Sequence, residues 1–320
     1  MRSMPMNSNC NLSAGTIIKG KWHRHSYEIE RLLGKGAVGE VYLARNSNGY
    51  VALKISENSA GITSEVNVLK KLAEAQGSDL GPSLIDVDDY EHPLLKKTIP
   101  FYVMEYIKGE HFISFVQKRG VEWIDILILQ LLNDLENLHR NGWVFGDLKP
   151  DNLIVSYPPA KVRCIDVGGT TRIGRSIKEF TEFFDRGYWE CGTRRAEPSY
   201  DLFAVSMIMI NAVYPKRFSK DGKGKEKIVS MIDSHPYLRK RKSILYKAIS
   251  NSYSSALIMR REIIDVIADE KEQRAKGKVQ VNRKQYKKQR KKKSSGFFET
   301  VFILVFIAFL YSLYVFTHLL

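Results

Sequence analysis

The run from Val144 to Ile154, VFGDLKPDNLI, constrains this chain more than any other part of its sequence. It places an aspartate (Asp147), a lysine two residues later (Lys149) and an asparagine five residues later (Asn152) in one short loop. Phosphoryl transfer needs such a set: a carboxylate for the proton of the attacking hydroxyl, a cation beside the moving phosphoryl group, and an amide oxygen on a metal. Apolar residues on both sides predict a loop anchored between a helix and a short strand.

A glycine-rich run, LGKGAVGEV, lies between strand-like stretches at residues 27–33 and 40–44. Glycines allow a tight hairpin whose backbone N–H groups can approach phosphate oxygens. The motif also fits a dinucleotide-binding turn, but that interpretation needs a helix directly afterwards, and here a strand follows. The residues of this run that we expect to contact a nucleotide are Leu33, Gly34, Gly36, Gly39 and Val41.

Three charged residues elsewhere complete the pattern. Lys54 closes the apolar strand-like stretch that begins at Val51, where an ammonium group needs a buried partner. Glu65, in a stretch with helical periodicity, can supply that partner. Asp166 stands between apolar residues and a glycine, a setting that suits a metal-holding acid.

The order of glycine loop, strand lysine, helix glutamate, D-x-K-x-x-N and D-x-G resembles that of the eukaryotic-like (Hanks-type) bacterial serine/threonine protein kinases, over about residues 27–268. The similarity is greatest to the membrane-anchored kinases of sporulating bacilli, because a basic linker and an apolar C-terminal segment follow. The resemblance implies an α+β, bilobal protein-kinase-like fold, with a small β-rich N-lobe and a larger helical C-lobe, plus one C-terminal transmembrane helix. It also implies ATP and Mg²⁺ as cofactors and proteins as substrates.

By this resemblance, Asp147 is the catalytic base and Lys149 contacts the γ-phosphate. Asn152 and Asp166 are the Mg²⁺ ligands, and Lys54 holds the α- and β-phosphates while paired with Glu65. The resemblance places the adenine ring between Ala52 and Ile154, beside a hinge that includes Glu105 and Ile107, and Gly192–Thr193 resembles the substrate-positioning segment.

Several positions depart from the family pattern. The usual H-R-D is Phe145-Gly146-Asp147, so the arginine that binds a phosphorylated activation loop is missing, although autophosphorylation remains possible. D-F-G is replaced by D-V-G, and A-P-E by Ala196-Glu197-Pro198.

No catalytic group is lost, which disfavours a pseudokinase scaffold. Gly146-Asp147 also fits small-molecule kinases of the aminoglycoside type, but Lys149 and the long segment from Asp166 to Glu197 favour a protein substrate. Candidate phosphoacceptors in that segment are Thr170, Thr171, Ser176 and Thr181.

The last 24 residues, Phe297 to Leu320, are almost entirely apolar or aromatic. A helix of that length spans about 36 Å at 1.5 Å per residue, enough for a hydrocarbon core of about 30 Å. Basic residues precede the span, so the positive-inside rule predicts a single-pass protein in the cell membrane with its kinase domain in the cytoplasm.

The segment from Arg274 to Lys293 contains eleven Lys and Arg residues and no acid, in a chain of formal charge +15. It has too few apolar residues to form a core of its own. Its charge suits either anionic lipid or the phosphates of DNA. The resemblance to membrane-anchored kinases favours DNA as an activating ligand, bound without sequence preference, and self-association for phosphorylation in trans. The DNA-binding candidates are Lys284, Lys287, Lys288, Arg290, Lys291, Lys292 and Lys293.

These features divide the chain into four parts: a loosely ordered N-terminus (1–22), a kinase domain (23–268), a basic juxtamembrane linker (269–296) and a transmembrane helix (297–320). The three cysteines, Cys10, Cys164 and Cys191, are odd in number and lack metal-ligand spacing, so we expect reduced thiols in a cytoplasmic setting.

Overall fold

A computed structural model describes residues 12–36, 38–74, 80–93, 96–220 and 222–319 of the chain. In α8, the side chains of residue 274, residues 277–296 and residues 318–319 lie outside this description. The chain divides into two units, Met1–Ile263 and Ile264–Leu320.

The N-terminal part of the first unit is a six-stranded antiparallel sheet with the strand order β1-β2-β3-β4-β6-β5. Alternating apolar residues on these strands pack into one core, which includes Tyr27, Leu53 and Phe101. The helix α1 (Ser59–Glu74) lies against β5 and β6. The strands are β1 (Ile17–Lys19), β2 (Ser26–Gly36), β3 (Gly39–Asn46), β4 (Gly49–Ile55), β5 (Leu84–His92) and β6 (Lys97–Glu105).

The rest of the first unit is mainly helical. Its central helix, α4 (Pro198–Val213), is buried over nearly its whole length. It begins at Pro198, because a proline fits the first turn of a helix. The other helices are α2 (Phe112–Arg119), α3 (Glu122–Arg140), α5 (Gly224–Ser234), α6 (Pro236–Lys240) and α7 (Lys242–Ile249), with short 3₁₀ turns η1 (Pro150–Asn152) and η2 (Glu182–Phe184).

Short strands hold the loops between these helices. One small sheet has the order β10-β9-β7, and a second pairs β11 with β8. Their bounds are β7 (Gly109–His111), β8 (Trp143–Val144), β9 (Leu153–Ser156), β10 (Lys161–Cys164) and β11 (Thr171–Arg172). A β-rich region followed by a helical region confirms the predicted α+β fold. Within the described residues, Cys164 and Cys191 are buried free thiols, and Cys10 lies outside them.

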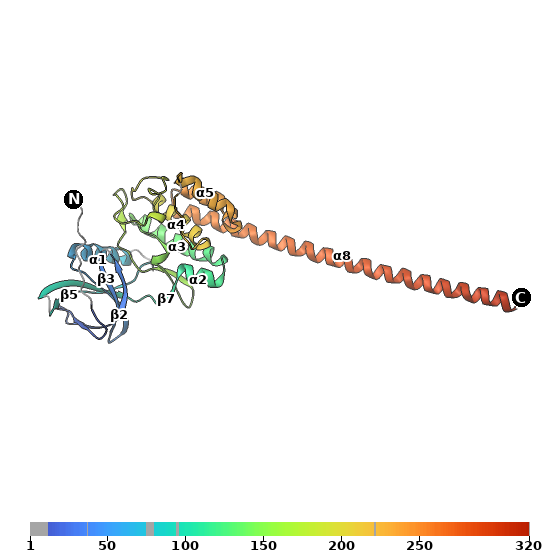
Figure 1. Ribbon diagram of the computed structural model, residues 1–320, viewed down its shortest axis with the longest axis horizontal. Helices are drawn as coiled ribbons and strands as arrows, with labels where there is room; N and C mark the ends of the chain where they lie inside the picture. Colours follow the sequence, from blue (N-terminus) through green and yellow to red (C-terminus); the bar gives the residue numbers. More distant parts are fainter. Residues whose placement is uncertain (1–11, 37, 75–79, 94–95, 221, 320) are drawn as a thin grey trace. The chain divides into compact units, whose positions relative to one another are not determined.

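The helix α8 (Ala256–Leu319) extends from the end of the first unit through the second, as Figure 1 shows. Its backbone is helical through the basic segment, a conformation that composition alone does not predict. Phe297–Thr317, 21 residues with a mean hydropathy of 2.3, is long and apolar enough to cross a membrane. The DNA-binding candidates Lys284 to Lys293 are in this helix, but their side chains lie outside the described ones.

Candidate active site

A cavity of about 420 Å³ lies where the glycine-rich hairpin of β2 and β3 faces β9 and the residues directly after β10. This volume is in the range of sites for small ligands. Its walls contain every residue predicted to contact a nucleotide except Glu65 and Lys149, namely Leu33, Gly34, Gly36, Gly39, Val41, Ala52, Lys54, Glu105, Ile107 and Ile154, together with both predicted metal ligands, Asn152 and Asp166. Sequence analysis missed Arg31, Tyr102, His111 and Ile165, which also line it.

Gly39 shows why the hairpin needs glycine. Its φ is +150°, and a Cβ atom there would lie 2.5 Å from the carbonyl oxygen of Ile55 on the neighbouring strand. The backbone therefore passes closer to β4 than any side chain would permit.

A buried ion pair lies at the inner end of the cavity. Lys54 Nζ on β4 is 2.7 Å from Glu65 Oε1 on α1, and both side chains are less than a tenth exposed. The hydroxyl of Tyr102 donates to the other carboxylate oxygen of Glu65 across 2.8 Å. Burial, together with the charge of Glu65, raises the pKa of Tyr102 well above its usual value, so it remains a donor. The predicted lysine–glutamate pair therefore forms, and its carboxylate is held on both oxygens.

Asp201, in the first turn of α4, holds the start of the D-x-K-x-x-N loop in place. The backbone N–H groups of Phe145 and Gly146 donate to its two oxygens at 2.8 and 3.0 Å, and His139 Nε2 lies 2.8 Å from it. Asp201 is fully buried. Sequence analysis missed this role, although an acid in so apolar a helix was a visible signal.

Within the loop, Lys149 Nζ forms an ion pair with Asp147 Oδ2. The amide nitrogen of Asn152 donates to the carbonyl oxygen of Asp147 at 3.3 Å. These contacts gather the proposed base, the cation and the amide in one place, as the motif spacing predicted.

The threonine that touches this group is Thr181. Its hydroxyl lies 2.8 Å from Asp147 Oδ1 and accepts from Lys149 Nζ at 3.0 Å. The expectation for Gly192–Thr193 is therefore corrected. The side chain of Thr193 is exposed, and its carbonyl oxygen accepts from Arg186 at 2.6 Å.

Gly146 explains the missing arginine. It has a φ of +85°, and a Cβ atom there would lie 2.5 Å from the carbonyl oxygen of Gly169. The catalytic loop and the segment after Asp166 therefore cross at two glycines, and no side chain fits at position 146.

The segment after Asp166 contains two predicted phosphoacceptors that are buried in this structure. Thr170 and Thr171 are each 1% exposed, and Thr171 donates its hydroxyl to the Gly169 carbonyl at 2.8 Å. A kinase cannot reach either hydroxyl in this conformation. Ser176 is exposed, and Thr181 is half-buried beside Asp147.

Arg186 ties the far end of this segment together. Its guanidinium is buried and donates to Glu197 at 2.6 Å, and to Ser199 and Asn251 at 2.8 Å each. The bond from Arg186 holds the pKa of Glu197 below its usual value, despite partial burial. In the altered A-P-E motif the glutamate thus retains a buried arginine partner.

Two further acids have shifted pKa values: Glu179, which interacts with the charge of Asp166, and Glu105, which lines the cavity. Glu179 is half-buried, and burial together with the charges of Asp166 and Glu65 raises its pKa, although Lys54 opposes the shift. Glu105, at the end of β6, receives two bonds from Arg163, at 2.8 and 3.0 Å, which lower its pKa.

The protein kinase domain family matches residues 27–286, most of the chain. The chain therefore belongs to the protein kinase family. It is 49% identical over 323 residues to the serine/threonine-protein kinase YabT of Bacillus subtilis, covering 96% of each chain. It is also 25% identical over 270 residues to serine/threonine-protein kinase D of Synechocystis, covering 76% of this chain and 52% of that one. CBL-interacting protein kinase 15 of Oryza sativa is 29% identical over 151 residues, covering 43% and 32%.

These similarities confirm the predicted class: the chain is a serine/threonine protein kinase, similar to YabT over nearly its whole length. They support a protein substrate rather than an aminoglycoside-type small molecule.

Proposed function

We propose that this kinase is anchored in the cell membrane by α8 and transfers the γ-phosphoryl group of ATP to serine and threonine hydroxyls of proteins, including its own. The observation that carries the catalytic assignment is the set of groups around one cavity. Lys54, Asn152 and Asp166 line it, and Glu65 is paired with Lys54. Asp147 is in the same loop as Asn152, whose side-chain amide donates to the Asp147 carbonyl oxygen.

Each of these groups has a role in the proposed transfer. Lys54, oriented by Glu65, binds the α- and β-phosphates, and Lys149 binds the γ-phosphate. Asp147 accepts the proton of the attacking hydroxyl. The carboxylate of Asp166 and the amide oxygen of Asn152 are hard oxygen ligands suited to Mg²⁺, which would neutralise charge on the phosphates.

Three substitutions test these roles. Lys54→Ala, Asp147→Asn and Asp166→Asn should each remove most autophosphorylation, because each removes a charge that acts on the transferred group. Asp151→Asn is the matched control, since Asp151 is in the same loop but is exposed and paired with Arg217. Near-wild-type transfer by Asp147→Asn, measured with labelled ATP, would refute the assignment of the base.

The membrane proposal is supported by the apolar stretch Phe297–Thr317 and by the basic residues that precede it. Expression of the full chain and of a form that ends at Lys293 tests it. The full chain should sediment with membranes and resist carbonate extraction, and its kinase domain should be protected from protease added outside the cell. The shorter form should become extractable if the segment is the anchor.

We also propose that the basic segment of α8 binds DNA and that binding stimulates the kinase. Its eleven cations and lack of acids match a phosphate backbone. Several kinases on one DNA would be concentrated relative to one another, which favours phosphorylation in trans. Anionic lipid is the alternative ligand, because the segment is next to the proposed membrane span. Phosphorylation assays with DNA and with anionic vesicles, added separately, distinguish the two.

A further inference from the structure

The N-terminal segment links the two edge strands of the six-stranded sheet, and we call this junction the seam. β1 pairs with β2 at one edge, and the residue after it, Gly20, forms a bridge to Tyr90 of β5 at the opposite edge. Lys21 N–H donates to the Asp89 carbonyl at 2.8 Å next to this bridge. The loop after β1 is therefore held against β5, far from the catalytic residues in sequence and outside the set that lines the cavity.

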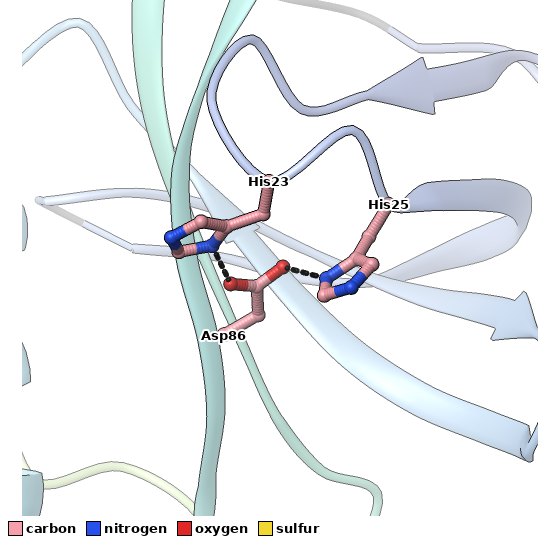
Figure 2. Close-up of side chains that lie close together, drawn as sticks. All are labelled: His23, His25 and Asp86. Atoms are coloured by element: carbon pink, nitrogen blue, oxygen red, sulfur yellow. Dashed lines mark hydrogen bonds and ion pairs between the residues drawn. The ribbon is translucent and has the colours of Figure 1, made fainter.

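Three potential metal ligands meet at this seam. Figure 2 shows the imidazoles of His23 and His25, from the loop, on either side of the Asp86 carboxylate from β5. His23 Nδ1 lies 2.6 Å from Asp86 Oδ1, and His25 Nδ1 lies 3.0 Å from Asp86 Oδ2. One ligand atom from each residue lies within 4.8 Å of the others.

The carboxylate is fixed and charged. Asp86 is 7% exposed, and it accepts the Tyr27 hydroxyl at 2.7 Å and the Val87 N–H at 2.9 Å. Burial alone would raise the pKa of Asp86, but the bonds from Tyr27 and the histidines offset it and leave the pKa below its usual value. Partners of this kind orient metal ligands and tune their affinity.

The loop that carries the histidines is itself pinned by its backbone. Asp88 accepts the N–H groups of Trp22 and His23 at 2.9 and 2.8 Å. Arg24, between the histidines, has a φ of +61°, a strained conformation for a residue with a side chain. Strain of this kind persists only where surrounding contacts impose it, and it is concentrated at functional sites. Here it belongs to the turn that presents both rings to Asp86.

We propose that His23, His25 and Asp86 bind a divalent transition-metal ion of the Zn²⁺ type, which fastens the N-terminal strand to β5. Two imidazoles and one carboxylate are a common ligand set for Zn²⁺, with water in the fourth position. Metal–ligand bonds of about 2.0–2.2 Å in a tetrahedron separate ligand atoms by roughly 3.4 Å. The observed 2.6 and 3.0 Å contacts reach that spacing by small rotations of the two rings, whose side chains are 54% and 65% exposed.

Direct metal binding tests this proposal without a kinase assay. The full chain, without a polyhistidine tag, is purified in detergent micelles, stripped with a chelator and dialysed against Zn²⁺ or Co²⁺. We expect one ion per chain and the visible absorption bands of tetrahedral Co²⁺. His23→Ala and His25→Ala should each weaken binding by about tenfold or more. Because both side chains are largely exposed, these variants should fold.

Two matched variants identify the source of any binding. His92→Ala removes a histidine from the same strand as Asp86, and Cys10→Ser removes a thiol near the N-terminus; both should bind the ion as the wild type does. Zn²⁺ should raise the melting temperature of the wild type and both controls, and leave that of the His23 and His25 variants unchanged. Absence of a bound ion, or wild-type affinity in His23→Ala and His25→Ala, would overturn the proposal and leave the cluster as a hydrogen-bonded clamp.

Discussion

The Thr181 hydroxyl lies 2.8 Å from Asp147 Oδ1, and Lys149 approaches the same threonine oxygen at 3.0 Å. Thr181 follows Asp147 by 34 residues, so this contact fixes part of the activation segment onto the catalytic loop. Because Lys149 also pairs with Asp147 Oδ2, one hydroxyl helps to orient both the proposed base and the cation.

Removing this hydroxyl should impair catalysis more than folding. Thr181→Val should lower kcat by roughly 10²-fold, the effect expected from slight misplacement of reacting groups, with little change in KM for ATP. Thr181→Ser keeps the hydroxyl and should retain most activity. The measurement is steady-state phosphorylation of a protein substrate. Equal kcat values for the valine and serine variants would show that the contact has no positioning role.

The close approach of Gly146 to Gly169 gives a prediction about stability, for which Gly142 is the control. Gly146 and Gly142 have similar φ values, +85° and +82°, but a Cβ atom at 146 would meet the Gly169 carbonyl, whereas nothing lies within 4 Å at 142. Gly142→Ala should cost about 1 kcal/mol of unfolding free energy, from backbone strain alone. Gly146→Ala should cost about 1–3 kcal/mol more, because the loops must separate.

Denaturant or thermal unfolding of both variants measures this difference. Gly146→Arg, which restores the family's usual arginine, should be at least as unstable as Gly146→Ala and inactive. A stable, active Gly146→Arg protein would contradict the crossing of these loops.

Contacts between residues close together in the sequence could be predicted from it, and contacts between residues far apart could not. The Asp147, Lys149 and Asn152 cluster was predictable because three residues of one short loop carry it. The Lys54–Glu65 pair was predictable because a buried ammonium needs an acid and a nearby helix offered one. Thr181 and Asp201 were not, because their partners lie 34 and 56 residues away and only tertiary packing brings them together. The burial of Thr170 and Thr171 likewise follows from the loop crossing, which no local pattern encodes.

The Glu105–Arg163 pair predicts how stability depends on pH. Arg163 lowers the pKa of Glu105 in the folded protein, relative to an ordinary value of 4.5. A lowered folded-state pKa gives stability that is fully present above the unfolded value and is lost as pH falls through the folded one. The melting temperature of the wild type should therefore exceed that of Glu105→Gln at pH 7, and this difference should shrink below about pH 4.5.

Glu91→Gln is the control for this prediction. Glu91 pairs with Lys21 at 2.9 Å, and its side chain is 67% exposed, so water screens the interaction. Its substitution should change the melting temperature little at either pH. A Glu105→Gln deficit that stayed constant from pH 7 to pH 4 would exclude the ion pair as its source.

The basic segment predicts how DNA binding should depend on salt. Each phosphate contact lowers log K by about 0.9 per log unit of salt, so replacing six cations should reduce the slope by up to about five. We therefore compare the full chain, in micelles or zwitterionic nanodiscs, with an alanine variant and with a charge-conserving variant in which the lysines become arginine. The six positions are Lys287, Lys288, Arg290, Lys291, Lys292 and Lys293.

DNA should stimulate the wild type and the charge-conserving variant alike, whatever its base sequence, because phosphate contacts carry no sequence information. The alanine variant should keep its basal activity and lose stimulation. If kinases act on one another along one DNA molecule, stimulation should rise and then fall as DNA is added, since excess DNA separates them. Equal responses of the alanine variant and the wild type at every DNA concentration would remove DNA as the ligand of this segment. A response to anionic vesicles alone, lost in the alanine variant, would assign the segment to lipid.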